Sequence, residues 1–112
     1  MSRDEILAMT PEQLRVEIAR KKGISDISYD YEGNWMGKTN GHVIYFPDYP
    51  CDLEATYQLE ESIPESGRDY YNSILWYLIA GNDPLCTHLF ELIHATAEQR
   101  SRAWLIWKEE CE

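Results

Sequence analysis

The sequence predicts an α+β domain in which helices pack on both sides of a small, mainly antiparallel sheet, an α/β/α sandwich. Helix-capping patterns stand in front of apolar residues at helical spacing, both early and late in the chain. Between them, residues 24–31 and 42–46 change to the alternating period of strands. With 112 residues, 44% of them hydrophobic, the chain is long enough to bury a core, and we expect a single domain over residues 1–112.

Two helices are expected first, because residues 2–5 and 10–13 both match the capping box. The first box precedes a short apolar turn at residues 6–9, and Pro11 suits the first position of the second helix. The second helix should end with the basic residues 20–22 beside the negative end of its dipole and stop at Gly23. A basic triplet can also contact nucleic acid, but completing a helix end is its commoner role.

A two-stranded hairpin follows in this prediction. Ile27, Tyr29 and Tyr31 alternate with polar residues, which is typical of a half-buried strand. Residues 33–41 are rich in turn-forming residues and are expected to form a loop, and residues 42–46 return as the second strand.

Residues 47–64 are expected to form the central helix around which the other elements pack. Asp48 would cap this helix, Pro50 fits its first turn, and Pro64 stops it. Acidic residues 54, 60 and 61 lie off the apolar stripe and should face water. The stripe itself consists of Ala55, Leu59 and Ile63.

The C-terminal half contains three more predicted elements. Apolar residues at helical spacing favour a helix over residues 68–80, although the apolar run at 74–79 also permits a strand. Alternation predicts a strand at residues 87–93. A third capping box at residues 96–99 begins a last helix that reaches about Glu109. Its expected apolar stripe is Ala97, Arg100, Trp104, Trp107 and Cys111, helped by Ala103.

The charge is unevenly distributed. The net charge is −10, and residues 26–69 contain ten acids and two bases. Direct binding to nucleic acid is not expected, because it requires a basic surface. An acidic surface instead favours solubility, a basic protein partner or mimicry of nucleic acid. The three cysteines are odd in number and lack CxxC spacing, which indicates reduced thiols and a cytoplasmic location. No apolar run approaches the length of a bilayer span, so no membrane association is expected.

Strong catalytic and metal-binding motifs are absent from the sequence. It contains no glycine-rich phosphate loop, GxSxG or HExxH motif, so we expect neither an enzyme nor a cofactor. His88 and His94 would lie about 20 Å apart along a strand, which is too far for one ion, so no metal site is expected. A helix N-terminus favours the thiolate of Cys51, but the acids Asp48, Asp52 and Glu54 oppose it.

Several segments resemble the phage ABA sandwich family. These are residues 3–9 with the helix at 14–23, and Pro47-Asp48-Tyr49 at the entry to a helix that contains Asp52 and Ala55. The resemblance covers roughly residues 3–63, and residues 94–100 also look like the closing segment of small phage and prophage proteins. It implies an α/β/α sandwich without an assigned activity and supplies no catalytic residues.

Two surfaces are candidates for binding. Trp35 and Lys38 lie in the glycine-rich loop, where Trp35 either anchors a partner or folds back over the hairpin. A row of acids on the hairpin and the central helix could face a basic groove. These acids are Asp26, Asp30, Glu32, Glu54, Glu60 and Glu61.

The function expected from these features is that of a non-enzymatic phage or prophage accessory protein in the host cytoplasm. It would bind, and thereby inhibit, a host protein with a basic surface, such as a defence or nucleic-acid-handling factor. One alternative is a protein that sequesters a nucleotide signal with Trp35, Lys38 and Arg100 or Arg102. Another is a structural phage component. Eight tyrosines and four tryptophans make a homo-oligomer plausible without fixing its size.

Overall fold

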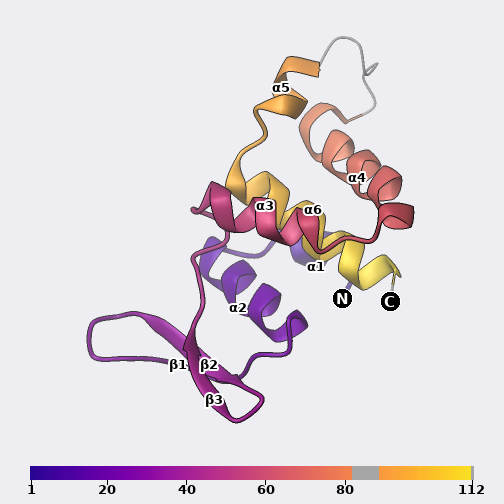
Figure 1. Cartoon of the computed structure of the whole chain (residues 1–112). Helices are drawn as coiled ribbons and strands as arrows, with labels where there is room; N and C mark the ends of the chain where they lie inside the picture. The colour runs from indigo at the N-terminus through magenta and orange to yellow at the C-terminus, as the bar shows by residue number, and fades with distance from the viewer. Residues whose placement is uncertain (82–88, 112) are drawn as a thin grey trace.

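The computed structural model describes residues 1–81 and 89–111, and it confirms the α+β class with a small antiparallel sheet (Figure 1). The sheet lies at one end of the molecule with α2 as its main helical neighbour, so the helices form a bundle beside it and not two layers around it. The elements are α1 (Arg3–Leu7), α2 (Pro11–Lys21), β1 (Ser25–Tyr29), β2 (Trp35–Thr39), β3 (His42–Tyr45), α3 (Leu53–Glu61), a 3-10 turn η1 (Glu65–Gly67), α4 (Arg68–Ala80), α5 (Leu89–Ile93) and α6 (Ala97–Cys111).

Helix α6 is the centre of the fold. It packs against α1, α2, α3 and α4, and Figure 1 shows it between these helices. The predicted centre at residues 47–64 is therefore wrong. The apolar residues 103–107 are consecutive, so they point in all directions around the helix axis and can be buried only if other elements surround it. The buried surface of α6 includes all of residues 103–107 and is therefore wider than the predicted stripe. It does not extend to Cys111, which is exposed.

Helix α3 begins later than predicted. Its N-cap is Asp52, whose carboxylate accepts the N–H of Ala55 at 3.2 Å, and not Asp48. The carbonyl of Asp48 instead accepts the N–H groups of Cys51 and Asp52 in a preceding turn. Pro50 explains this order, because the residue before a proline avoids the helical region. The predicted stripe of Ala55, Leu59 and Ile63 is buried.

The sheet is a three-stranded meander and not the predicted hairpin, because residues 35–39 form its middle strand. Thr39 pairs with His42, so Asn40 and Gly41 are a two-residue turn, with φ values of 51° and 80°. An Asn-Gly pair is a strong hairpin signal because both residues tolerate positive φ. At Gly37 a Cβ would lie 2.4 Å from the Cγ2 of Ile24, so only glycine fits there.

The expected burial of Tyr29 and Tyr31 on one face of the first strand is wrong. Both are exposed, and only Ile27 is partly buried. The register is irregular between Ser25 and Ser28, where Asp26 has a φ of 51°. Such a bulge breaks the alternation on which the prediction depended.

The helix at residues 68–80 is confirmed as α4, whereas residues 89–93 form α5 and not a strand. A short apolar segment satisfies either period. The guanidinium of Arg100 donates from Nη2 to the carbonyl of Ile93 and from Nε to that of Ala95, which stabilises the helical end. The remainder of the predicted strand, with Cys86 and His88, lies outside the described residues. All three predicted capping boxes are present, at Ser2, Thr10 and Thr96.

Two carboxylates near the end of α6 connect it to α1 and α2. Glu110 accepts hydrogen bonds from Nε and Nη2 of Arg3 at 2.9 and 2.8 Å, and Glu109 lies 2.6 Å from the Nζ of Lys21. The Arg3 guanidinium, helped by the Tyr70 hydroxyl, lowers the pKa of Glu110 below its usual value. The Lys21 ammonium does the same to the pKa of Glu109.

We expect the free energy of unfolding to fall as the pH is lowered from about 7 to about 3. A carboxyl with a lowered folded-state pKa stabilises the protein fully above its unfolded pKa of about 4.3, and this stabilisation is lost as the pH falls through the folded value. Glu110→Gln should flatten this dependence, whereas Glu61→Gln, at an exposed position, should not. Urea unfolding monitored by circular dichroism measures it. Equal pH dependence in wild type and E110Q would contradict the assignment.

Candidate functional site

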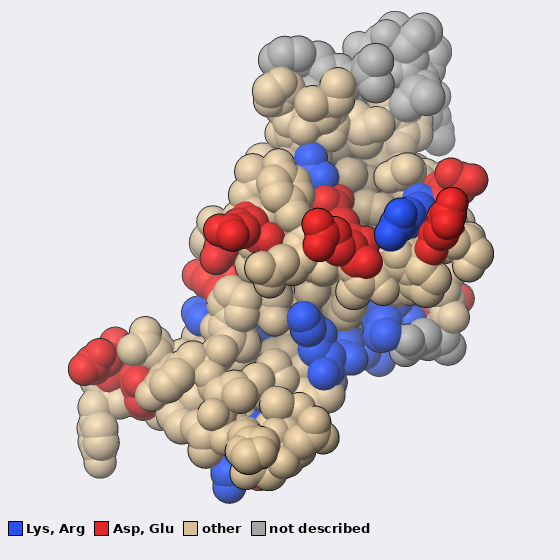
Figure 2. Space-filling view, in the orientation of Figure 1, with Lys and Arg blue, Asp and Glu red and all other residues tan. Residues whose placement is uncertain are grey.

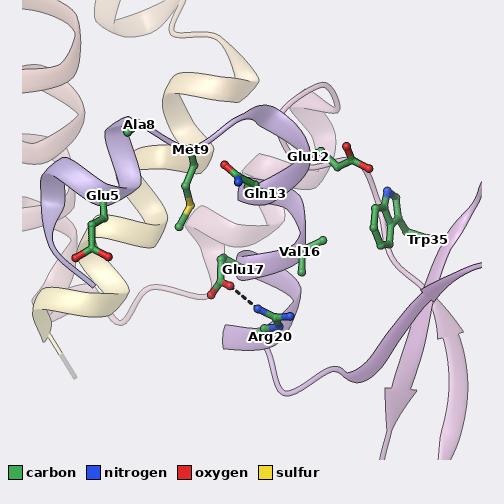
Figure 3. Close-up of a pocket in the computed structure, with 9 residues that line it drawn as sticks. All are labelled: Glu5, Ala8, Met9, Glu12, Gln13, Val16, Glu17, Arg20 and Trp35. Carbon is green, nitrogen blue, oxygen red and sulfur yellow. Dashed lines mark hydrogen bonds and ion pairs between the residues drawn. The ribbon is translucent and has the colours of Figure 1, made fainter.

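An open groove runs along the outer face of α2, between the end of α1 and the β2 strand (Figure 3). Its volume is about 680 Å³. Helix α2 buries Leu14, Ile18 and Ala19 against the core, which leaves the opposite face to form the floor of the groove. The lining side chains are Glu5, Ala8, Met9, Glu12, Gln13, Val16, Glu17, Arg20 and Trp35.

Trp35 forms one end of the groove, where Figure 3 shows its ring beside Glu12. It pairs with Tyr29 across the β1–β2 ladder, and the two ring centroids are 3.9 Å apart with 35° between the planes. The ring of Phe46 lies 6.4 Å away on the inner side. Trp35 is thus half-buried and folds back against its own chain, while part of it remains available to the groove. The predicted folding of Trp35 back over the hairpin is confirmed, whereas its role as an anchor for a partner stays a prediction.

The rim of the groove is acidic. Glu5 caps α1, and hydrogen bonds from the backbone and the side chain of Ser2 lower the pKa of its carboxyl. Glu12 accepts the hydroxyl of Tyr29, and Glu17 lies 2.6 Å from the Nη1 of Arg20, the one base among the lining residues. The groove therefore combines negative charge with an apolar floor made by Ala8, Met9 and Val16.

The sequence does not mark these acids as site residues. Its local pattern predicts helix-capping and first-turn roles for Glu5 and Glu12, and the structure confirms those roles. One pattern in the sequence does indicate the groove: Glu12 and Glu17 flank Val16 on the face of α2 opposite the buried Leu14 and Ile18. The contributions of α1 and Trp35 depend on tertiary contacts and leave no such pattern.

The acids predicted on the hairpin have different environments. The carboxylate of Asp30 accepts the N–H groups of Glu32 and Asn34 at 2.9 and 2.8 Å, and these bonds, the one from Asn34 above all, lower its pKa. Asp30 thus holds the β1–β2 turn and is only partly exposed, and its predicted role in binding a partner stays a prediction. Asp26 and Glu32 are exposed.

On α3 the prediction that the acidic side chains face water is confirmed for two of the three. Glu54 and Glu61 are exposed, but both carboxylate oxygens of Glu60 accept from Nη1 of Arg100, at 3.0 and 2.9 Å, and the Tyr71 hydroxyl also donates to Glu60. Burial, helped by the bond to Glu60, raises the pKa of Tyr71. Figure 2 shows the acidic side chains over α3 and those at the tip of the sheet as separate groups, with uncharged and basic surface between them. The six predicted acids therefore do not form one continuous row.

The residues proposed for a nucleotide pocket are not assembled around Trp35. Lys38 is exposed on β2 and does not line the groove. Arg102 donates to the carbonyls of Ile6 and Met9 at 2.8 and 2.9 Å and so caps α1. Arg100 donates to the carboxylate of Glu60 and to the carbonyl of Ile93 at the end of α5.

The described residues give little support for a nucleophilic cysteine or a metal site. The Asp48 carboxylate raises the pKa of the exposed Cys51 thiol, as its acidic surroundings predict, which disfavours a nucleophilic thiolate. Within residues 1–81 and 89–111, no three histidine, cysteine or acidic side chains gather closely enough to hold a metal ion. None of the described helices is long and apolar enough to cross a bilayer.

Comparisons with protein-family models, with curated proteins and with solved structures find no match for this chain. The resemblance to the phage ABA sandwich family thus remains a prediction.

Proposed function

We propose that this protein is a non-enzymatic binding protein that holds a basic, partly apolar segment of a partner protein in the groove along α2. The supporting observation is the combination of the carboxylates of Glu5, Glu12 and Glu17 with the apolar side chains beneath them. Complementary charge around such a floor guides a cationic segment into place and discriminates against acidic ones.

Trp35 gives the groove an anchoring position. Tryptophan is one of the residue types that most often contribute a large share of the binding energy at protein interfaces. Its stacking on Tyr29 fixes its orientation before a partner arrives, which lowers the entropic cost of association. An amphipathic helix with lysine or arginine flanking an apolar stripe fits this surface.

The resemblance to phage proteins favours a bacterial host protein as the partner. A defence or nucleic-acid-handling factor has the required basic surface, and occupation of that surface by an acidic groove would inhibit it. This proposal keeps the partner class expected from the sequence and moves the contact from α3 and the sheet tip to α1, α2 and Trp35.

Charge reversal distinguishes the groove from the surface predicted by sequence. We expect Glu12→Lys with Glu17→Lys to abolish capture of the partner from bacterial lysate at low salt and to weaken binding of the purified partner at least tenfold, because like charges then face each other. The matched control, Glu54→Lys with Glu61→Lys, makes the same charge change on α3 and should leave affinity within about threefold, since only long-range electrostatics is altered.

Mass spectrometry of captured proteins, followed by calorimetry with the purified partner, measures both effects. Wild-type binding should weaken as salt is raised. If the α3 reversal removes binding and the α2 reversal does not, the binding surface is the acidic row on α3. If neither changes the affinity for any captured protein, the acidic-surface proposal fails.

A further inference from the structure

The free edge of β3 is a second surface open to contact, separate from the acidic groove. The strand order is β1-β2-β3, so β3 has a strand on one side only, and β2 is its main neighbour among the described elements. Figure 1 shows the sheet at the end of the molecule opposite α4 and α5. An edge strand carries unpaired N–H and C=O groups with which another strand can pair.

The unpaired backbone groups at this edge belong to Val43 and Tyr45. The two-residue turn before β3 places His42 in a hydrogen-bonded pair with β2, and such pairs alternate along an antiparallel ladder. His42 and Ile44 therefore bond to β2. The N–H and C=O groups of Val43 and Tyr45 point away from it, and no group in the described part of the chain pairs with them.

The opposite edge of the sheet, at β1, is protected in ways that β3 is not. Strand β1 contains the bulge at Asp26 and lies beside α2. Bulges and charged side chains are devices that prevent an edge from pairing. Strand β3 has a regular register and contains no aspartate, glutamate, lysine or arginine. Val43 and Tyr45 are 54% and 62% exposed, and Figure 2 shows a largely uncharged surface over the sheet, with acidic side chains gathered at its tip.

We propose that two copies of this protein pair through β3 in antiparallel orientation, so that three strands from each copy form one six-stranded sheet. A two-fold axis at Ile44 places Val43 of each copy opposite Tyr45 of the other. Each of these pairs exchanges two backbone hydrogen bonds. Each also brings a β-branched side chain against an aromatic ring, which is a favourable cross-strand combination.

The charges beside β3 favour a second copy as the occupant of this edge. Lys38 pairs with Val43 across the β2–β3 ladder and is the only lysine or arginine in residues 24–67. The hydrogen-bonding carboxylate of Asp30 raises the pKa of the Tyr45 hydroxyl, so these two groups lie together. Across the two-fold axis, Lys38 of each copy comes toward Asp30 of the other. Such an isologous contact closes on itself and leaves no free β3 edge.

The contact is small, and this limits its strength. It joins four residues of each copy and buries less than the roughly 1,200 Å² at which stable interfaces begin. We expect a dissociation constant on the order of 100 µM, so dimers form only in concentrated solution. The proposal goes beyond the proposed function and does not depend on it, because no β3 residue lines the acidic groove. Each copy keeps its own groove in the dimer.

Sedimentation velocity of the whole chain, from about 10 µM to about 1 mM, measures the association. Val43→Pro removes the outward N–H without touching the β2–β3 ladder, and it should raise the dissociation constant at least tenfold, because each copy loses a hydrogen bond. The matched control, Val43→Thr, keeps the N–H and the branched Cβ and should stay within about threefold of wild type. Circular dichroism checks the fold of both variants.

Disulfide cross-linking tests the register and does not depend on the proline variant. In a background whose three native cysteines are serine, Ile44→Cys should form a covalent dimer under mild oxidation, because the Cα atoms on the axis lie about 4.5 Å apart. Val43→Cys is more exposed but should cross-link far less, because its two Cα atoms lie about 8 Å apart in this register, beyond the reach of a disulfide.

A concentration-dependent dimer that V43P weakens and V43T preserves, together with preferential cross-linking of I44C, supports the proposal. A wild-type protein that stays monomeric at about 1 mM overturns it. A dimer that forms equally well in folded V43P overturns it too, because another surface then makes the contact. Cross-linking of V43C at least as efficient as that of I44C contradicts the two-fold axis at Ile44.

Discussion

Replacing Leu105 with alanine should lower the free energy of unfolding by about 3 kcal/mol or more. Leu105 is 0% exposed and lies in the middle of α6, where neighbours on α1 to α4 surround the helix. Rigid elements on several sides cannot all move in to fill the space that the lost side chain leaves, so the cavity persists and adds to the lost transfer energy. A loss of this size is a large part of the stability of a small domain.

The control for this prediction is Leu53→Ala. It makes the same chemical change at the first residue of α3, where the leucine is 41% exposed, and it should cost less than about 1 kcal/mol. Thermal unfolding followed by circular dichroism should place the two variants about 10 °C or more apart. Similar melting temperatures for the two variants would show that α6 is not the centre of the core.

The second large effect is expected for Glu60→Gln, which should cost about 2 kcal/mol. Glu60 and Arg100 have side-chain exposures of 20% and 11%, so the pair is mostly removed from water. Glutamine keeps the shape of the side chain but leaves the guanidinium charge without its counter-charge, and one of its two terminal atoms can no longer accept a hydrogen bond. Arg100 also holds the end of α5, so that segment should loosen with it.

Glu61→Gln, the next residue on the same helix, provides the comparison. Its carboxylate is exposed, and we expect a change within about 0.5 kcal/mol. Urea unfolding gives both values, and hydrogen exchange of the amides of residues 89–95 reports on α5. Equal stability of the two variants would show that the pair of Glu60 with Arg100 does not stabilise the fold and that Glu60 behaves as an exposed surface acid.

Local signals in the sequence were sufficient wherever a few adjacent residues decide the structure. The capping boxes at Ser2, Thr10 and Thr96 each form reciprocal hydrogen bonds within four residues. Helices α2 and α6 begin directly after two of these boxes, and α4 begins directly after the predicted break at residues 65–67. The Asn40-Gly41 pair carried a further local signal, because its positive φ values define a tight turn between two strands. A two-residue turn of this kind requires strands directly on both sides of it, which is why residues 35–39 form a strand and not part of a loop.

The sequence by itself thus determined the α+β class, most helix starts and the apolar stripe of α3, because these depend on hydrogen bonds and periodicity within single elements. Only the tertiary structure decided that α6 is the centre, since burial around a whole helix depends on how many neighbours reach it. It also separated the predicted acids: Asp30 holds a turn, and Glu60 pairs with Arg100, 40 residues away in sequence. The acidic groove likewise joins residues from α1, α2 and β2, which are separate elements of the chain. Its position follows from packing, which no local pattern records.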